Sequence, residues 1–557
     1  MDILQILTSF FPSGSSEQAA VKDDKKVQAI CDILRSYPVT ARSENMKSGI
    51  DQVYKGVPEE GMSTEEVVAH IINSISPGLA AGQSGPRYFG FVTGGALPAA
   101  QCGDILATIY DQNVQVHLPN ESISTAVEWR TLEMVLDLLD LPRDLFGGRS
   151  LTGGATASNI LGIACGRDYA VQRALNDATY SVADNGMPSG VRIRVLTDRH
   201  HASIEKATAI VGIGRKNVVD LSATSKGLST PFVNRLESAL QVYHGQAIES
   251  GEKVGFIVVV SFAEVNTGDF TDMEGVKRLC DKYSAWLHID AAFGALACLL
   301  PEYSNVSGYL KDADSITADG HKTFNTPYAS GIFFTRSASA LTAIMAGSTI
   351  PAYLAAPPST SQDALDPTAS WLSSIPSPLH TNLDNSRRFI ALPLYSSILH
   401  MGRKGYHDLM ERNVLFAREI AEWMSNGDGS QWYECLNLRD MDPRGERITP
   451  ISARGIQDFR TVPLNVVLFR ARNVDNVPVS YRRSTSDEQA KQDVLATIML
   501  IKDINATKRM FVSPGAYPGG AIRIAVSNWM TGLNDSGTDL ECVKEVLQEV
   551  MTGATEP

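Results

Sequence analysis

From about residue 148 to residue 335 the chain alternates short apolar segments with amphipathic ones, and this alternation constrains its fold more than any other feature. Apolar runs separated by helices of roughly ten to fifteen residues are typical of parallel strands whose crossover helices cover both faces of a sheet. We therefore expect an α/β domain with a mainly parallel sheet. The expected strands are residues 191–198, 255–262, 286–290, 314–317 and 331–335, and the expected helices include 201–212 and 272–283.

The segments on either side of this region predict two further parts. Apolar residues at three-and-four spacing indicate helices over residues 27–37 and 64–75, the second with Ser63 as its N-cap, and a longer helix over 121–142. After a long helix that begins near residue 386, the chain has strand patterns and a final helix. We divide it into a helical N-terminal arm (1–84), a large α/β domain (85–385) and a smaller α+β domain (386–557).

Residues 355–385 are rich in Pro, Ser and Ala and show no apolar period. We expect a long mobile loop here, and loops of this length in compact enzymes often act as lids.

The composition narrows the class of function. The chain has 557 residues, 43% of them hydrophobic, and a formal net charge of −13, which argues against a nucleic-acid surface and favours a small-molecule ligand. Its seven cysteines are scattered without a CxxC pair, as free thiols of a reducing compartment are. Asp2 stands where a secretory signal would carry positive charge, and no apolar run is long enough to span a membrane. We expect a cytosolic enzyme.

Lys322 is the first candidate catalytic residue. It follows the expected strand at 314–317 and precedes a Pro/Tyr/Gly loop that cannot continue a helix. A lysine pinned and partly desolvated in such a place becomes a nucleophilic amine that forms a Schiff base with a carbonyl cofactor. An ordinary solvated lysine is the alternative reading.

The motif TGGATASN (152–159) places a Gly-Gly turn before a helix. Backbone N–H groups at such a helix start bind a phosphate, and the hydroxyls of Thr156 and Ser158 can add donors. The motif matches neither a dinucleotide fingerprint nor a Walker A loop, so it indicates a cup for a single phosphate. A purely structural turn is the alternative.

Asp290 ends the expected buried strand in WLHIDAAFGA (286–295), where open α/β sheets bind ligands. A carboxylate buried there needs a cationic or strong donor partner, and the small residues after it leave room for a flat group. The alternative is a helix N-cap. A metal site of Asp290 with His288 is disfavoured, because no further ligand lies nearby in the sequence.

Two other residues stand out. His201, at the start of the helix HASIEKA, can present its ring to a planar ligand or donate a proton, or can be a structural histidine. Arg523 lies inside the apolar strand AIRIAVSN (521–528), where a guanidinium needs a partner; a substrate carboxylate and a structural salt bridge are both open.

Together these motifs supply what pyridoxal phosphate (PLP) requires: a lysine, a phosphate cup, a carboxylate for the pyridine nitrogen and a clamp for the ring. From about residue 60 onward the chain resembles the PLP-dependent group II amino-acid decarboxylases, which include the aromatic-amino-acid and glutamate decarboxylases. The resemblance rests on PRYFGF, TGGATASN, HASIEKA, HIDAAFGA, ADGHKTFNTPYASG, RRFIALPLYSSILHMGRKGY and IRIAVSNWMT.

This resemblance implies the aspartate-aminotransferase fold, type I, with a mainly parallel seven-stranded sheet in the large domain. By similarity, Lys322 forms the Schiff base, Asp290 holds the pyridinium proton and His201 stacks on the ring. The resemblance further assigns the phosphate to Ala155, Thr156 and His321, the other ring face to Ala292, and the substrate carboxylate to Arg523. It also implies a homodimer with the cofactor at the interface, in which the segment 116–120 with His117 enters the neighbouring subunit's site.

The expected reaction is decarboxylation of an L-amino acid to the amine and carbon dioxide. Two departures from the family pattern leave other outcomes open: the usual proline before His-Lys is Gly320, and residues 355–385 contain no tyrosine to return a proton to Cα. Trp371 and His380 are the notable side chains there, and Tyr353 lies just before it. The alternatives are oxidative deamination coupled to decarboxylation, carbon–carbon lysis, transamination, or a silent PLP-binding scaffold.

Overall fold

The computed structural model describes residues 32–222, 231–346, 367–439, 461–482, 489–533 and 537–553. These residues form two compact units, which are described separately. The first holds residues 96–410 among those described, and the second holds 32–95, 411–439 and the described residues from 461 onward. The division into an arm, a large domain and a small domain stays a prediction.

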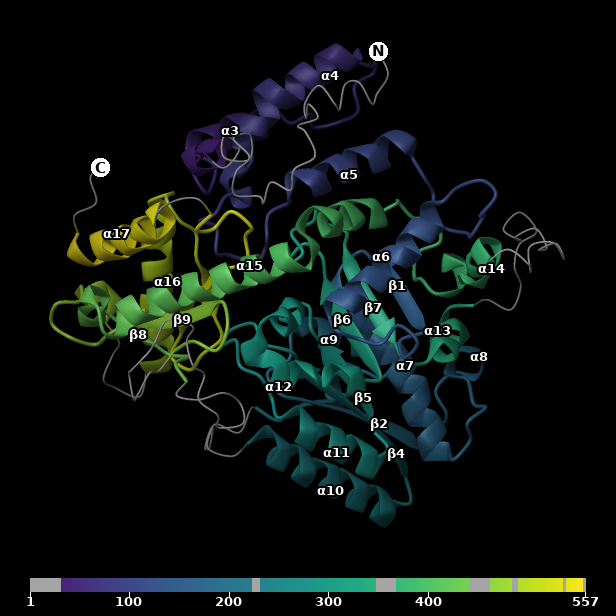
Figure 1. The fold of residues 1–557 in the computed structure, drawn as a ribbon. Helices are drawn as coiled ribbons and strands as arrows, with labels where there is room; N and C mark the ends of the chain where they lie inside the picture. Colours follow the sequence, from purple (N-terminus) through teal and green to yellow (C-terminus); the bar gives the residue numbers. More distant parts are fainter. Residues whose placement is uncertain are drawn as a thin grey trace. The chain divides into compact units, whose positions relative to one another are not determined.

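The first unit is built on a seven-stranded sheet with the strand order β1-β7-β6-β5-β4-β2-β3 (Figure 1). Neighbouring strands from β3 through β6 pair in parallel, whereas β7 runs antiparallel to β6 and β1. The mainly parallel sheet is confirmed, although β1 and β3 were not among the five expected strands. The strands are β1 (Gly148–Thr152), β2 (Val191–Thr197), β3 (Val218–Asp220), β4 (Lys253–Ser261), β5 (Trp286–Asp290), β6 (Ser315–Asp319) and β7 (Gly331–Thr335).

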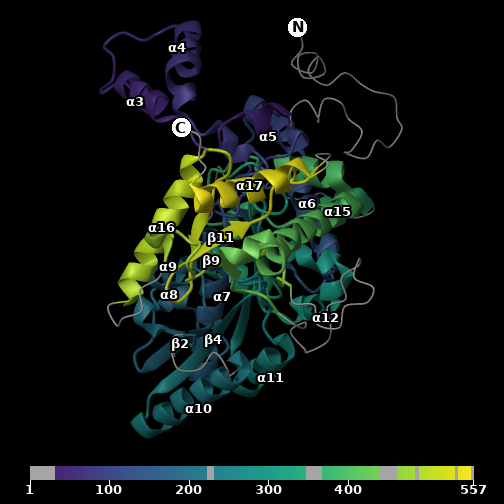
Figure 2. The same cartoon turned by 90° about the vertical axis from the view of Figure 1, so that its left-hand side faces the viewer.

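Helices cover both faces of this sheet because buried side chains alternate along its central strands. Ile257 of β4 packs against α7 (Ala155–Leu175) at Gly166, while the neighbouring Phe256 meets the ring of Tyr283 on the other face, 6.4 Å away between centroids. Figures 1 and 2 both show α10 (Phe232–Ser250) and α11 (Met273–Tyr283) side by side next to β2 and β4. The remaining α-helices of this unit are α5 (Pro98–Tyr110), α6 (Ser124–Leu138), α8 (Val182–Asn185), α9 (Ala202–Ile210), α12 (Ser304–Ser307), α13 (Ala338–Met345) and α14 (Pro367–Ser374).

The expected loop at 355–385 is partly helical. Residues 355–366 lie outside the described residues, but Pro367 begins α14 and a 3-10 turn spans Pro378–His380, so the prediction of an irregular segment is wrong here. Tertiary contacts stabilise this stretch in place of an apolar period: the Arg130 guanidinium lies over the Trp371 ring, 3.8 Å from its centroid. Proline is also favourable at the first position of a helix.

The second unit contains a four-stranded antiparallel sheet with the order β10-β11-β9-β8. Its helix α4 (Thr64–His70) has Ser63 as its N-cap, as the sequence predicts, and continues as a π-helical turn to Ile75. Ser63 also forms a reciprocal capping box with Glu66, which was not predicted. The helix α15 (Ala391–Ser425) passes from the first unit into the second and departs from helical geometry at Gly402, where φ is 57°. The other elements are α3 (Ser43–Gln52), β8 (Tyr433–Cys435), β9 (Val466–Ala471), α16 (Gln489–Ala506), β10 (Ser513–Gly515), β11 (Ala521–Ala525) and α17 (Thr538–Thr552).

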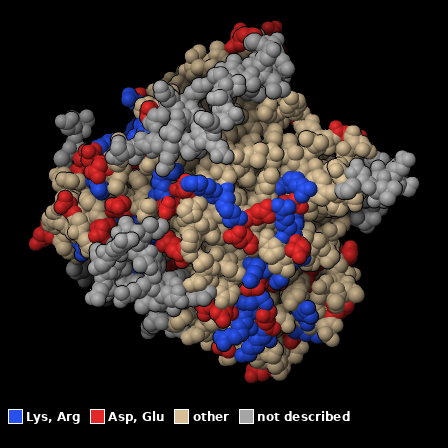
Figure 3. Space-filling view, viewed as in Figure 1, with Lys and Arg blue, Asp and Glu red and all other residues tan. Residues whose placement is uncertain are grey.

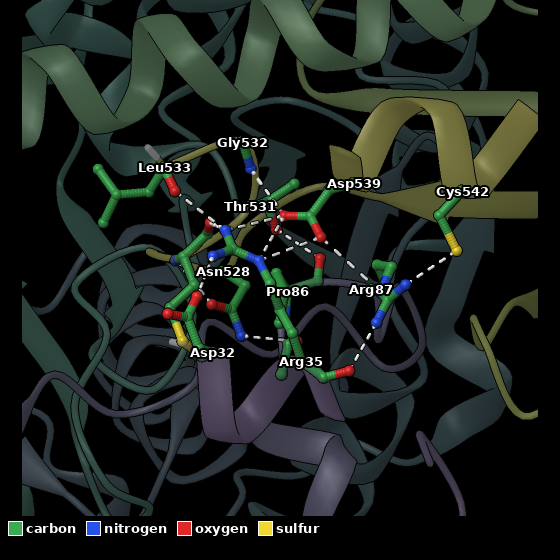
Figure 4. A network of polar contacts seen from close by, with 12 residues as sticks. Asp32, Arg35, Pro86, Arg87, Asn528, Thr531, Gly532, Leu533, Asp539 and Cys542 are labelled. Atoms are coloured by element: carbon green, nitrogen blue, oxygen red, sulfur yellow. Dashed lines mark hydrogen bonds and ion pairs between the residues drawn. The ribbon is translucent and has the colours of Figure 1, made fainter. Parts of the chain in front are cut away.

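A buried carboxylate ties distant parts of the second unit together. Asp539, at the start of α17, is 0% exposed and lies 3.2 Å from Arg35 Nη2 and 3.7 Å from Arg87 Nε (Figure 4). Arg35 also donates to the carbonyl of Leu533, and Arg87 donates to the carbonyl of Arg35. These bonds join segments near residues 35, 87 and 530–540 into one polar cluster.

Charged side chains of both signs share the surface shown in Figure 3, where Lys and Arg lie among Asp and Glu. An ion pair joins α11 to α10, with Lys282 Nζ 3.1 Å from Glu237 Oε1. Among the described residues, no helix combines the length and apolar character needed to cross a bilayer.

Candidate active site

Most candidate residues of the first unit lie at or just after the ends of three strands. β7 is antiparallel to both β1 and β6, so β1 runs in the same direction as β6 and β5. The carboxyl ends of β1, β5 and β6 therefore lie at the same edge of the sheet, which is where α/β sheets bind ligands. Ala155 and Thr156 follow β1, Asp290 ends β5, and Lys322 follows β6.

The turn before α7 has the geometry of an anion site. A Cβ added at Gly153 or Gly154 would meet no atom within 4 Å, so the space in front of the turn is open. Ala155 N–H, at the start of this 21-residue helix, already donates to an anionic group, the Asp319 carboxylate, at 3.3 Å. Thr156 is half-buried. The Gly-Gly turn thus fits a phosphate.

Ser158 does not contribute a donor to this turn, contrary to expectation. Its side chain is 0% exposed, and its Oγ lies 2.8 Å from Thr152 Oγ1. The hydroxyl instead fastens the first turn of α7 to the end of β1.

Asp290 is buried, with 8% of its surface exposed, and each of its carboxylate oxygens accepts a hydrogen bond. Ala292 N–H donates to Oδ1 at 3.1 Å, and the Asn159 amide donates to Oδ2 at 2.9 Å. Charge-assisted bonds of this kind fix the carboxylate plane. This rigid acceptor fits the N–H of a protonated pyridine ring.

His201 is an exposed residue at the N-cap of α9. Its Nδ1 accepts a hydrogen bond from the backbone N–H of Ser203 at 3.2 Å and lies 2.8 Å from the Ser203 hydroxyl. The ring orientation is thus set by a residue two positions along the chain.

Lys322 lies in a tight turn after β6 and is half-buried. Its carbonyl accepts hydrogen bonds from the backbone and side-chain amides of Asn325, both at 3.3 Å, which hold the turn. A Cβ at Gly320 would lie 2.7 Å from the Ser330 side chain, so this turn has no room for the proline that the family usually carries there.

His321 faces the carboxylate that also meets α7. Its Nδ1 lies 2.8 Å from Asp319 Oδ1, and its ring lies 4.8 Å from that of Tyr328 between centroids. Asp319 therefore connects the turn that holds Lys322 to the start of α7, and the sequence did not single it out.

His117 and Arg523 are not brought to this group by the contacts described. Both ring nitrogens of the buried His117 are engaged, Nδ1 with Thr125 Oγ1 at 2.7 Å and Nε2 with the Leu372 carbonyl at 2.8 Å. Desolvation lowers the pKa of His117. Arg523 lies in the second unit on β11, where its Nη2 donates to Ser513 Oγ at 3.2 Å.

Asn159, Ser203 and His288 support the site and were not expected to do so. Asn159 Nδ2 also donates to Ser203 Oγ at 3.0 Å, and its Oδ1 lies 2.9 Å from His288 Nε2. Burial lowers the pKa of His288 because the charged ring would lose its hydration. One pattern could have revealed the group: Asn159, Gly162 and Gly166 share one face of α7, and both glycines pack against β5 side chains.

The fold and this constellation define the class: a lysine amine, a rigid carboxylate and an open anion turn at one sheet edge belong to a PLP-dependent enzyme. The pyridoxal-dependent decarboxylase conserved domain matches residues 44–430. The chain belongs to this family, and its reaction is PLP-dependent decarboxylation of an amino acid.

Known proteins resemble it over most of its length. Tyrosine decarboxylase of Papaver somniferum is 26% identical, with 90% of each chain covered. Phenylacetaldehyde synthase of a Rosa hybrid cultivar is 25% identical over 69% of this chain and 70% of its own. The crystal structure of Oryza sativa TDC with PLP and tryptamine has a TM-score of 0.71 at 19% identity, covering 96% of this chain and 97% of that one.

Proposed function

We propose that the chain converts an L-amino acid to the amine and carbon dioxide, with Lys322 as the residue that joins the cofactor carbonyl. The observation that carries this proposal is that three features lie at one edge of the sheet. They are the turn with Lys322, the Asp290 carboxylate with its two hydrogen bonds, and the open turn at Gly153 and Gly154.

Each residue has a distinct task in this proposal. Bound PLP supplies an electron sink for a bond at the amino acid's Cα. Asp290 holds the proton of the pyridine nitrogen, because its two oxygens are already oriented by Ala292 and Asn159. Ala155, Thr156 and His321 bind the phosphate, while His201 and Ala292 take opposite faces of the ring. When the substrate's carboxylate leaves as carbon dioxide, the bond between Cα and the carboxyl carbon breaks, and Cα then takes up a proton.

Aldehyde formation is the second candidate reaction, because residues 355–385 contain no tyrosine to return that proton. In that reaction dissolved dioxygen would take up two electrons and become hydrogen peroxide, and water would release the aldehyde and ammonia. A relative that covers about two thirds of the chain is named phenylacetaldehyde synthase. Another relative is named tyrosine decarboxylase, so aromatic amino acids come first in a substrate panel.

The test combines one variant with product analysis. Lys322→Ala should lose the visible absorbance of the bound cofactor and slow turnover by at least about a thousandfold. Lys311→Ala, a matched exposed lysine on the turn before β6, should retain both. Wild-type enzyme should release one carbon dioxide per amine. Aldehyde with ammonia would favour the second reaction, and keto acid without carbon dioxide would refute decarboxylation.

We assign Arg523 to the substrate carboxylate, His117 to the neighbouring subunit's site in a homodimer, and the enzyme to the cytoplasm. The cytoplasmic assignment is supported by the six described cysteines, which are all free thiols, as is usual in a reducing compartment.

In the same kinetic panel, Arg523→Met should raise KM and leave the cofactor absorbance intact; unchanged kinetics would favour a structural salt bridge. A light-scattering mass of one chain would refute the homodimer.

A further inference from the structure

A continuous series of hydrogen bonds runs through the first unit. It begins at Trp286, the first residue of β5, and ends at His201, the candidate ring-stacking residue. Its side chains come from β5, β6, α7 and α9, and Asn159, His288 and Ser315 are each 0% exposed. In order along the chain of bonds, the members are Trp286, Ser315, His288, Asn159, Ser203 and His201, with Asp290 attached at Asn159.

Chemistry fixes the direction of the bond at one end of this series and the atom that faces His288. The Trp286 indole can only donate, and its Nε1 lies 3.0 Å from Ser315 Oγ, so this hydroxyl accepts there. Its own proton is then available for His288 Nδ1 at 2.8 Å. The Asp290 carboxylate accepts from the Asn159 amide nitrogen, so Asn159 Oδ1 is the atom that faces His288 Nε2 at 2.9 Å. A neutral His288 therefore carries its proton on Nε2 and donates to Oδ1.

The same logic orients the Asn159 amide. A carboxylate oxygen accepts, so the amide nitrogen is the atom that faces Asp290 Oδ2 at 2.9 Å, and it also faces Ser203 Oγ at 3.0 Å. Both N–H groups of the amide are thus used. The opposite orientation would place a carbonyl oxygen against the Asp290 carboxylate.

The last bonds determine the tautomer of His201. Ser203 N–H donates to His201 Nδ1 at 3.2 Å, so this nitrogen is an acceptor. The Ser203 hydroxyl, which accepts from Asn159, then donates to the same nitrogen at 2.8 Å. A ring that accepts at Nδ1 carries its proton on Nε2 when neutral.

We propose that Asn159 is a positioning residue whose amide orients the Asp290 carboxylate and, through Ser203, holds the Nε2–H tautomer of His201. The importance of this for catalysis rests on the proposed function, in which Asp290 and His201 contact the cofactor. The hydrogen-bond directions themselves do not depend on the reaction.

The first measurement reads the tautomers directly. In full-length apoprotein with ¹⁵N-labelled histidine, ring nitrogen signals of His288 and His201, identified by His288→Gln and His201→Gln, should show the neutral rings protonated on Nε2. A proton on Nδ1 of either ring would overturn the proposal. If the directions hold and the enzyme releases no carbon dioxide, the inference stands and the proposed reaction fails.

The second measurement is the Kd of the apoprotein for PLP at pH 8 and pH 6. Asn159→Asp removes the donor and places a second carboxyl beside Asp290, so at pH 8 the Kd should rise by about tenfold or more. At pH 6 the pair of carboxyls takes up a proton, which restores a donor, and the deficit relative to wild type should shrink. Asn159→Leu should show a similar deficit at both values, because it cannot take up a proton.

Cys165→Ala is the matched control, since Cys165 is also fully buried on α7, and its Kd should match that of wild type. A Kd of Asn159→Asp within about twofold of wild type, or a deficit that does not change with pH, would overturn the proposal. Should Asn159→Leu fail to fold in a thermal melt, the tautomers and the Asn159→Asp profile still decide.

Discussion

The imidazole of His288 links the stability of the first unit to pH. Burial lowers the pKa of His288, whereas a histidine in an unfolded chain titrates near about 6.5. Below that value the unfolded chain binds a proton that the folded ring does not, so the free energy of unfolding falls as the pH falls. This residue contributes a slope of up to about 1.4 kcal/mol per pH unit. The lowered pKa of His117 acts in the same direction.

We therefore expect the melting temperature of the wild type to fall between pH 7 and pH 5.5, and that of His288→Gln to fall less steeply. His244→Gln, which changes an exposed histidine on α10, should keep the wild-type slope. Equal slopes for His288→Gln and the wild type would contradict the prediction, because they would show that His288 takes up a proton in the folded state as readily as in the unfolded chain.

At the scale of elements, α7 packs close to β5 because two glycines face that strand. A Cβ at Gly162 would lie 2.4 Å from the His288 ring, and one at Gly166 would lie 2.8 Å from the Trp286 ring. Glycine normally costs a helix about 1 kcal/mol relative to alanine. At these positions the close approach outweighs that cost, because the hydrogen bond from His288 to Asn159 depends on it.

We expect alanine to change the melting temperature in opposite directions at two helical glycines. Gly162→Ala should lower the melting temperature and weaken PLP binding, since the new methyl group displaces the His288 ring. Gly245→Ala, on α10 with no atom within 4 Å of the new Cβ, should raise the melting temperature slightly. Thermal unfolding of both variants checks this, and stabilisation by Gly162→Ala would contradict the close packing.

At the scale of the whole molecule, the second unit gathers segments from both ends of the chain around one buried carboxylate. Removing one partner of such a group leaves uncompensated charge in the interior, which costs about 3 to 5 kcal/mol. Asp539→Ala removes the carboxylate partner of both Arg35 and Arg87. We expect the free energy of unfolding, measured with denaturant, to fall by this amount, and tryptic cleavage within residues 32–95 to become faster. The matched control is Asp475→Ala, which removes a fully exposed carboxylate that pairs with Arg482 and should leave the free energy of unfolding almost unchanged. Equal effects of the two variants would contradict a structural role for the Asp539 cluster.

The sequence by itself determined the elements whose signals are local. The strands at 286–290 and 331–335 have the predicted bounds, and Ser63 caps its helix as predicted. Hydrophobic period and capping act over a few residues, so they can be read without knowing the neighbours. The motifs also placed Lys322 and Asp290 next to strand ends and the Gly-Gly turn before a helix, where the structure has them.

Only the tertiary structure decided what supports these residues. Asn159 reaches Asp290 across 131 positions and His288 across 129, and nothing near Asn159 in the sequence indicates that its amide has these partners. Likewise α14 forms in a stretch without an apolar period, where the Arg130 guanidinium covers Trp371. Such contacts form only once the sheet has brought α7, β5 and α9 together. Their directions also need the tertiary structure, because the role of a side chain as donor or acceptor depends on the group that it meets.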